Sequence, residues 1–125
     1  MRIAYLVEDD PRIRAHLVPA LAELADVEVV AFADTESQAV EWIGKHCSET
    51  DLVILDIYLK RGTGLGVLSQ RGGFPLGCHI VVLTNSADEG MRARCAALGA
   101  EAVFDKTTEL DEFFGYCRAI PPKLH

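Results

Sequence analysis

Four short apolar runs divide this chain, and each run ends directly before polar or charged residues. The runs lie at 3–7, 52–55, 80–83 and 102–104, and the residues that follow them are Glu8 with Asp9, Asp56, Thr84, and Asp105 with Lys106. Continuous apolar runs of this length are typical of strands that are buried on both faces of a parallel sheet. Ligands of such sheets bind beyond the carboxyl ends of the strands, so these polar groups are expected to converge at one edge. Acids, a hydroxyl and an ammonium together suit a metal ion and a phosphoryl group.

The size and composition of the chain indicate one folded domain. Its 125 residues suffice for one hydrophobic core, and an apolar content of 50% argues against disorder. The apolar stretches are far shorter than a membrane span, and a strand that begins at residue 2 leaves no room for a signal peptide. We therefore expect a cytoplasmic protein without a membrane partner. A net charge of −7 without any basic run disfavours direct nucleic-acid binding.

The four cysteines are widely spaced and form no C-x-x-C motif. They are Cys47, Cys78, Cys95 and Cys117. An even number allows disulfides, but a single core of this size does not need them in a cytoplasmic protein. Zinc binding would require closer pairs of cysteine and histidine. We therefore predict four reduced thiols with a structural role.

Strands and helices are expected to alternate along the chain. Strands are predicted at 3–7, 27–32, 52–55, 79–83 and 102–104. Helices are predicted from a cap at Asp10 over 11–24, from a cap at Asp34 or Thr35 through 43, at 65–70, at 87–98 before Gly99, and from a cap at Thr107 or Thr108 through 117. Pro19 predicts a kink or a local break in the first helix. Arg92 and Arg94 are expected on a solvated helix face.

This alternation predicts an α/β fold in which helices cover both faces of a parallel sheet. Crossovers between parallel strands are right-handed, which leaves few topologies. A doubly wound strand order 2-1-3-4-5 places the first and third strands side by side at the switch point. This order would bring Glu8, Asp9 and Asp56 together.

Five features of the sequence occur in the order and spacing of a known family. They are the acidic pair Glu8 and Asp9, the lone Asp56, Gly64 in the following loop, Thr84 after the fourth strand, and Lys106 after the fifth. With these features, the chain resembles the receiver domain of two-component response regulators over essentially its whole length. The resemblance implies a flavodoxin-like (βα)5 fold, and a single receiver domain at residues 1–125 with no effector domain.

The resemblance also implies what the acidic residues do. Asp56 would accept a phosphoryl group from a histidine kinase or a phosphotransfer protein. The ligands of a Mg²⁺ ion, which Mn²⁺ can replace, would be Glu8, Asp9, Asp56 and the backbone carbonyl of Tyr58. The chemistry agrees, because neighbouring carboxylates resist joint ionisation and a divalent cation relieves their repulsion. A carboxylate is also a nucleophile that can form an acyl phosphate.

Three further residues are expected near the phosphoryl group by the same resemblance. The Lys106 ammonium would neutralise charge on the group during transfer. The Thr84 hydroxyl would donate to a phosphoryl oxygen and pull the loop after the fourth strand, which shifts the balance between two loop arrangements. Asn85 stands where a small residue is common, so its amide would either contact the phosphoryl group or obstruct it.

The sequence departs from the family pattern near its fifth strand. Many receivers carry Tyr or Phe at the position of Val103, as a switch coupled to Thr84. Val103 has no ring, and Phe104 should point to the other face of the sheet. A proline usually follows the lysine, but Thr107 follows Lys106, so no cis peptide bond is expected there. Output is therefore expected to use the loop and helix after Thr84.

We therefore expect a signalling phosphoacceptor and not a turnover enzyme, with Mg²⁺-dependent self-phosphorylation and slow self-dephosphorylation as its only reactions. It would signal to an unidentified downstream protein, and a homodimer through the fourth helix, fifth strand and fifth helix is a further hypothesis. Two alternatives stay open. One is a receiver-like scaffold that binds partners without phosphorylation. The other is a phosphohydrolase with Asp56 as nucleophile. Such enzymes require a second acid, which acts as the general acid and base, at the position where this chain has Tyr58.

Overall fold

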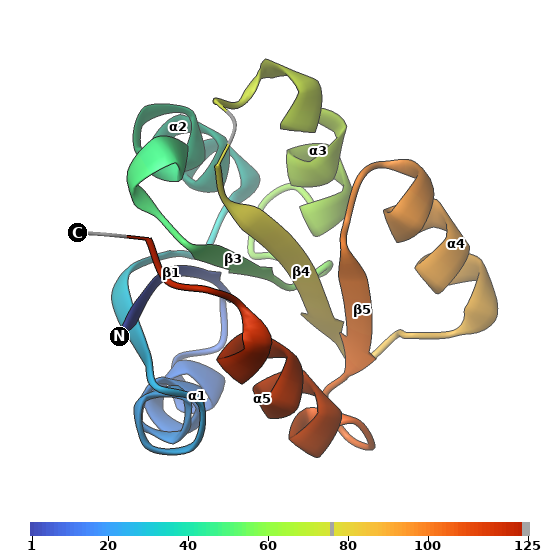
Figure 1. Ribbon diagram of the computed structural model, residues 1–125. Coiled ribbons are helices and arrows are strands. Elements are labelled where there is room, and N and C mark those ends of the chain that lie inside the picture. The colour runs from blue at the N-terminus through green and yellow to red at the C-terminus, as the bar shows by residue number, and fades with distance from the viewer. Residues whose placement is uncertain (76, 124–125) are drawn as a thin grey trace.

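Five parallel strands form one sheet in the order β2-β1-β3-β4-β5 in the computed structural model, which describes residues 1–75 and 77–123 (Figure 1). The strands are β1 (Arg2–Val7), β2 (Val27–Ala33), β3 (Leu52–Leu55), β4 (His79–Thr84) and β5 (Ala102–Asp105). Each pair of neighbouring strands is parallel. The predicted flavodoxin-like topology and its strand order are therefore confirmed.

Helices cover both faces of this sheet. They are α1 (Pro11–Ala25), α2 (Glu36–His46), α3 (Gly64–Ser69), α4 (Glu89–Ala97) and α5 (Leu110–Ala119), with short 3-10 turns η1 (Cys47–Glu49) and η2 (Arg71–Gly73). One face packs against α1 and α5, and the other packs against α2, α3 and α4 (Figure 1). The strands are apolar throughout because both of their faces are covered. Among the described residues, no helix has both the length and the apolar character needed to cross a membrane.

Side chains along the central strands alternate between two cores. In β3, Leu52 and Ile54 join the core under α1 and α5. Val53 and Leu55 join the core under α2, α3 and α4. Each of the four is at most 1% exposed, and burying one such side chain stabilises the fold by about 1.5–3 kcal/mol. A register shift of one residue would exchange the two cores, so packing fixes the register that positions Asp56.

The first and third strands end side by side, as the predicted order requires. Val7 and Leu55, the last residues of β1 and β3, are register partners. The N–H of Asp56 donates to the carbonyl of Val7 at 2.9 Å, and the N–H of Glu8 donates to the carbonyl of Ala33 at 3.0 Å. Glu8 and Asp56 therefore leave neighbouring strands at the same edge of the sheet.

α1 begins as predicted but does not break at its internal proline. The Asp10 carboxylate caps the helix by accepting from the N–H of Arg12 at 2.8 Å. The helix then runs to Ala25 through Pro19, so the local break, one of the two predicted alternatives to a straight helix, does not occur. Burial of Leu17 and Leu21 on either side of the proline stabilises the continuous helix, although one backbone hydrogen bond is missing.

Two other predicted helix ends are confirmed. Thr35 caps α2, since its hydroxyl accepts from the N–H of Gln38 at 3.3 Å. Gly99 follows the last residue of α4 and its cap, and it adopts a φ of 102° that favours glycine. The sequence signals for a cap and for a helix stop therefore identified these boundaries correctly.

The start of α5 differs from the prediction. The helix begins at Leu110 after Glu109, so a cap at Thr107 or Thr108 is wrong. The Asp105 carboxylate accepts from the N–H groups of both threonines, at 2.7 and 3.1 Å. These hydrogen bonds place the threonines in a turn before the helix, and they lower the pKa of Asp105. A short acidic side chain thus competes with the helix for the same amides.

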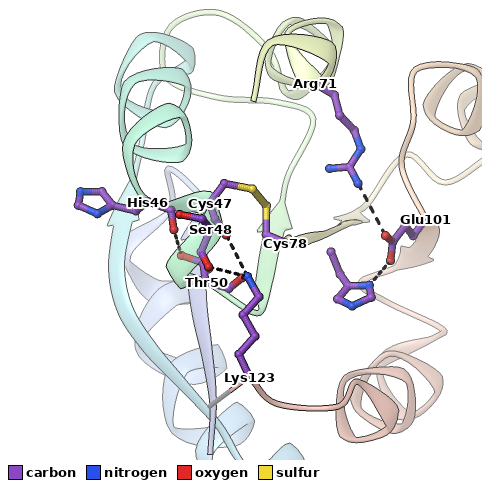
Figure 2. Close-up of a disulfide and its surroundings, with 9 residues drawn as sticks. His46, Cys47, Ser48, Thr50, Arg71, Cys78, Glu101 and Lys123 are labelled. Atoms are coloured by element: carbon purple, nitrogen blue, oxygen red, sulfur yellow. Dashed lines mark hydrogen bonds and ion pairs between the residues drawn. A yellow bond between two sulfur atoms is a disulfide. The ribbon is translucent and has the colours of Figure 1, made fainter. Parts of the chain in front are cut away.

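Cys47 and Cys78 are joined by a disulfide, so the prediction of four reduced thiols is wrong for this pair (Figure 2). Cys47 opens η1, and Cys78 directly precedes β4. Their Cα atoms lie 5.3 Å apart, within the span of a disulfide, although the two cysteines are 31 positions apart in sequence. The parallel pairing of β3 with β4 creates this proximity, which the sequence spacing does not reveal. Cys95 and Cys117 are free and buried.

Candidate functional site

Three carboxylates meet at the carboxyl ends of β1 and β3. Glu8, Asp9 and Asp56 each contribute an oxygen atom, and the three atoms lie within 4.8 Å of one another. Glu8 is 2% exposed and Asp56 is 8% exposed, whereas Asp9 is only partly buried. The fold therefore brings together the three acids that were expected to bind a metal ion.

The ammonium of Lys106 reaches the same cluster from the loop after β5. Its Nζ donates to Asp56 Oδ2 at 2.9 Å and also donates to Glu8 Oε1. The backbone N–H of Lys106 donates to the carbonyl of Thr84 at 3.0 Å, which ties the start of this loop to β4. One ammonium against three carboxylates leaves the cluster negative, as a cation-binding pocket requires.

Burial and neighbouring charges shift the ionisation of this cluster. Burial raises the pKa of Glu8, the hydrogen bond from Lys106 opposes that rise, and the charge of Asp56 adds to it. Burial lowers the pKa of Lys106, but the hydrogen bonds and charges of Glu8 and Asp56 outweigh burial and raise it. Lys106 therefore stays charged while the carboxylates repel one another, and a divalent cation would relieve that repulsion.

The loop after β3 holds the backbone around Asp56. Asp56 Oδ1 accepts from the N–H of Ile57 at 2.7 Å, and the N–H of Gly64 donates to the carbonyl of Ile57 at 2.7 Å. A Cβ atom added to Gly64 would lie 2.1 Å from the carbonyl oxygen of Asp56. A side chain at position 64 would therefore displace the backbone of Asp56. This close approach explains why glycine occurs in the loop after β3.

Tyr58, whose carbonyl was predicted as a metal ligand, lies in the same loop. It forms an isolated antiparallel bridge with Thr63. The N–H of Thr63 donates in turn to Glu36 Oε1 of α2 at 2.9 Å. These contacts hold the backbone around Tyr58, whereas its side chain is 58% exposed.

Thr84 and Asn85 connect the loops after β4 and β5. Thr84 is buried at the end of β4, opposite Asp105 in register, and its Oγ1 accepts from the N–H of Ser86 at 3.3 Å. Asn85 Oδ1 accepts a long hydrogen bond of 3.5 Å from the hydroxyl of Thr107. The two loops are therefore in contact beside the acidic cluster.

Arg92 was expected on a solvated face, but its side chain is only 39% exposed and its guanidinium is bound by other segments, which the prediction did not include. Its guanidinium donates to the carbonyl of Ala87 at 2.9 Å and to the carbonyl of Val103 at 2.8 Å. It also pairs with the carboxylate of Glu109. Arg92 therefore links three segments, namely the loop after β4, strand β5 and the start of α5.

No sequence signal distinguishes Arg92 from Arg94, which is exposed as predicted. The rotation of α4 against β5 alone decides which arginine is held. The hydrogen bond from Arg92 lowers the pKa of Glu109, and the hydrogen bond that Glu109 accepts from the N–H of Asp105 at 2.9 Å lowers it further. The ionised Glu109 therefore holds Arg92 and β5 together.

Val103 and Phe104 lie next to each other in β5. Val103 packs in the core under α2, α3 and α4, whereas Phe104 packs under α1 and α5. The two side chains thus point to opposite faces of the sheet, as predicted. No cis peptide bond occurs in the described part of the chain, which includes the bond between Lys106 and Thr107.

Comparisons with known proteins identify one family. The model of the response regulator receiver domain matches residues 4–117. A curated relative, a putative transcriptional regulator from Pseudomonas aeruginosa, is 30% identical over 115 residues. This match covers 92% of the chain and 54% of the relative, so the chain spans about half the length of that relative.

Solved structures of bacterial response regulators share the fold. The BeF3-activated N-terminal receiver domain of Klebsiella pneumoniae RstA is 27% identical, with a TM-score of 0.79 over 94% of this chain and 97% of that chain. A DNA-binding response regulator of the LuxR family from Staphylococcus aureus is 22% identical, with a TM-score of 0.82 over 96% and 98%. The CheX-CheY complex with BeF3 and magnesium from Borrelia burgdorferi matches at 18% identity, with a TM-score of 0.75 over 92% and 88%. At their level of identity, the last two show the fold alone.

Proposed function

Because this chain belongs to the response regulator receiver domain family, we propose that its Asp56 accepts a phosphoryl group from a phosphohistidine on a partner protein. The phosphorylated domain then presents a changed surface to a downstream protein. It acts as a signalling phosphoacceptor and not as a turnover enzyme.

The arrangement around Asp56 is the observation that carries this proposal. The Lys106 ammonium lies 2.9 Å from Asp56 Oδ2, and two further carboxylates lie beside the same side chain. A phosphoryl group transferred to Asp56 would lie next to a fixed positive charge and a cation-binding pocket. Phosphoryl transfer depends mainly on positioning and on charge neutralisation, which is what these groups offer.

In the proposed step, a carboxylate oxygen of Asp56 attacks the phosphorus atom of the phosphohistidine. The new P–O bond forms as the P–N bond breaks, and the leaving imidazole keeps the electron pair and takes up a proton from solvent. The product is an acyl phosphate on Asp56. Lys106, which Glu8 holds in place, remains beside the new group and balances part of its negative charge.

Glu8, Asp9 and Asp56 are proposed to hold Mg²⁺ or Mn²⁺ together with the backbone carbonyl of Tyr58. The donor set supports this, because carboxylate and carbonyl oxygens are the ligands that these hard cations prefer. Four protein ligands leave coordination positions for water and for a phosphoryl oxygen. The bound ion would neutralise charge that develops on the oxygens of the transferred group.

We propose that the loop after β4 carries the change at Asp56 to the surface. The buried Thr84 hydroxyl would turn towards the new phosphoryl oxygens and draw this loop inwards. Arg92 binds the loop, strand β5 and Glu109 at once, so it would transmit the movement to α5. The Arg92 contacts would thus replace the aromatic switch residue, for which this chain has Val103.

The phosphodonor is proposed to dock in a groove between α1 and α5. Apolar side chains that include Ile13 and Phe114 line this groove, which has a volume of about 350 Å³ and reaches Asn85 and Lys106. An apolar helix of a histidine kinase or phosphotransfer protein could bury its own apolar face here. Its phosphohistidine would then lie beside the pocket that contains Asp56.

Residues 1–125 are proposed to act as one receiver domain, in the cytoplasm, through contacts with proteins and not with nucleic acid. The CheX-CheY complex from Borrelia burgdorferi is an example of a protein of this fold in complex with another protein.

A homodimer through α4, β5 and α5 is proposed as the phosphorylated form. Light scattering with and without beryllofluoride should show a doubling of mass, and an unchanged mass would contradict the dimer.

Intact mass spectrometry after incubation with acetyl phosphate tests the acceptor. In Mg²⁺, the parent protein should gain the mass of one phosphoryl group, and Asp56→Asn should gain none. The matched control Asp111→Asn, which alters an exposed acid on α5, should label like the parent. Chelation of Mg²⁺ should abolish labelling in every variant that otherwise labels.

The same assay separates the proposal from its alternatives. An unlabelled parent protein would contradict it and favour a scaffold that works without phosphorylation, especially if Asp56→Asn still binds partners. Repeated turnover of a phosphate ester would instead favour a hydrolase. A single stable gain of mass that depends on both Asp56 and Mg²⁺ would support the phosphoacceptor.

A further inference from the structure

We propose that Cys47 and Cys78 form a reversible thiol–disulfide site that senses peroxide and controls the attachment of the C-terminal segment at 120–123. The disulfide lies close to the residues at which β3 and β4 begin (Figure 2). The acidic cluster follows the opposite, carboxyl ends of β1 and β3. This proposal goes beyond the phosphoacceptor function and does not depend on it.

Backbone hydrogen bonds keep the two cysteines in the same neighbourhood when the disulfide is open, although they restrain η1 less tightly than the cross-link does. The N–H of His79, next to Cys78, donates to the carbonyl of Asp51 at 3.0 Å. The N–H of Thr50 donates to the carbonyl of Cys47 at 3.2 Å, which closes η1 directly before β3. Strand pairing then continues with Leu52 opposite His79. Reduction would therefore leave two thiols side by side in a folded protein, ready to form the bond again.

The other two cysteines are poor candidates for the same chemistry. Cys95 and Cys117 are fully buried, and burial raises the pKa of both thiols, that of Cys117 to about 12. Oxidation needs a thiolate and access to the sulfur. Cys78 is 5% exposed, whereas each of the other three cysteines is at most 1% exposed, so Cys78 is the most accessible of the four. Oxidation is therefore directed to one pair out of the four cysteines.

A positive charge lies beside this pair and also ties down the end of the chain. Lys123 Nζ donates to the carbonyl of Cys47 at 3.3 Å and to the carbonyls of Ser48 and Thr50 at 2.9 Å each (Figure 2). A Cβ atom added to Gly77 would lie 2.9 Å from the same Nζ atom. Lys123 therefore binds the backbone on the Cys47 side of the disulfide, and its ammonium fills the space that a side chain at Gly77, next to Cys78, would need. A positive charge in this neighbourhood favours the thiolate form when the bond is open.

Through the same lysine, the redox state of the cysteine pair controls how firmly the C-terminal segment at 120–123 is attached. The carbonyls that bind the ammonium belong to η1 and its flanks, whose geometry the disulfide restrains. The backbone N–H of Lys123 also donates to Asp51 Oδ1 at 2.8 Å, so the segment is fixed at two points. Opening the disulfide loosens the three carbonyls together, and the C-terminal segment then detaches more often.

The chemistry balances with a peroxide as oxidant and a dithiol as reductant. The thiolate of Cys78 attacks hydrogen peroxide, which forms a sulfenic acid and, with the proton that the thiol gives up, one water molecule. The thiol of Cys47 then displaces the hydroxyl group, and the disulfide and a second water molecule are produced. Two electrons pass from the thiols to the peroxide. A dithiol returns both electrons by exchange and becomes a disulfide itself.

Counting thiols by mass tests the redox site. The full chain is reduced with dithiothreitol, desalted, exposed to hydrogen peroxide, and alkylated with N-ethylmaleimide under denaturing conditions. Four adducts are expected before peroxide and two afterwards, and native treatment with dithiothreitol should restore four. Cys78→Ser should show three adducts at both stages. The matched control Cys95→Ala should change from three adducts to one.

Hydrogen exchange of the Lys123 amide tests the attachment. This amide should exchange on the order of tenfold faster in the reduced protein than in the oxidised protein, because local opening no longer has to strain a cross-link. In Lys123→Met, exchange at this position should be fast in both redox states. The amide of Ile3, which donates to the other oxygen of Asp51 at 2.7 Å, is the internal control and should not change.

Three outcomes would overturn the proposal. Four adducts after peroxide would mean that the pair does not react. Two adducts that persist in native dithiothreitol would make the disulfide a permanent cross-link and not a switch. Equal exchange of the Lys123 amide in both redox states would remove the link to the C-terminal segment. None of these measurements involves Asp56, so they fail or succeed independently of phosphorylation.

Discussion

Lys106 and Asp56 are fifty positions apart in sequence, yet the ammonium of one donates to the carboxylate of the other at 2.9 Å. The pairing of β4 with β5 and the contact of the Lys106 N–H with the Thr84 carbonyl create this approach. The proposed phosphoacceptor is therefore held beside the cation that would balance its charge during transfer.

Replacing Lys106 with methionine should slow phosphorylation of Asp56 by acetyl phosphate, because the charge that stabilises the transferred group is lost. Removal of one such electrostatic contact typically slows a reaction on the order of 100-fold. Labelling rates from intact mass measure the effect. The control Lys60→Met removes an exposed lysine and should label like the parent. Equal rates for the parent and Lys106→Met would remove the lysine from the mechanism.

Gly64→Ala should destabilise the protein and slow its labelling, since the new Cβ would lie 2.1 Å from the carbonyl oxygen of Asp56. Relief of this clash requires the backbone to move, which typically costs about 1–3 kcal/mol. Urea unfolding gives the change in stability. The matched control is Gly72→Ala, because a Cβ at position 72 meets nothing within 4 Å. A Gly64→Ala variant as stable and as reactive as the parent would show that the loop yields freely.

Arg92→Met should remove the coupling by which phosphorylation of Asp56 alters the start of α5. The Asp105 amide donates to Glu109, which Arg92 holds, so its hydrogen exchange reports on this linkage. Phosphorylation should change this exchange in the parent and in the control Arg94→Met, but not in Arg92→Met. A full response in Arg92→Met would mean that the signal leaves the site by another path.

The pair formed by Arg92 and Glu109 predicts a pH dependence of stability. The hydrogen bond from Arg92 lowers the pKa of Glu109, so the folded state favours its ionised form. This stabilisation is complete above the ordinary pKa of glutamate and disappears as the pH falls through the lowered value. The parent should be more stable than Glu109→Gln near neutral pH, and the difference should shrink below about pH 4.

Urea unfolding of both proteins across that range measures the difference. Glu112→Gln, which alters an exposed acid in the first turn of α5, is the control and should show no comparable change. A stability difference that stays constant down to low pH would contradict the role assigned to the Glu109 charge.

Reduction of the disulfide between Cys47 and Cys78 should lower the stability of the fold. Closing a loop with a sequence separation of 31 restrains the unfolded chain and is worth about 3–4 kcal/mol. The midpoint of urea unfolding should therefore fall when dithiothreitol is added. A variant with serine at both positions should have the lower midpoint and no response to dithiothreitol. An identical midpoint for both states of the parent would contradict this.

The acidic cluster could be located from the sequence because each member follows a buried strand. Glu8 and Asp56 each come directly after a continuous apolar run, and parallel strands deliver such residues to one edge. The same reasoning placed Thr84 and Lys106 at that edge. Local signals likewise identified the caps at Asp10 and Thr35, since capping depends on residues only two or three positions away.

Features that depend on tertiary contacts could not be predicted from local sequence signals. The start of α5 was misplaced because Asp105 captures the amides of Thr107 and Thr108 in a turn. Pro19 did not break α1, since the packing of the helix against the sheet outweighs one missing hydrogen bond. Helix propensity describes the preference of an isolated segment. Tertiary packing determines which conformation that segment adopts in the folded protein.

The amino-acid sequence by itself determined the order of strands and helices, the two-sided burial of the sheet, and the edge at which the acids and the lysine meet. Hydrophobic periodicity and strand ends carry that information along the chain. The tertiary structure alone decided that Cys47 meets Cys78 and that Arg92, and not Arg94, reaches Glu109. Those contacts depend on strand pairing and on the rotation of a packed helix, which arise only when distant segments come together.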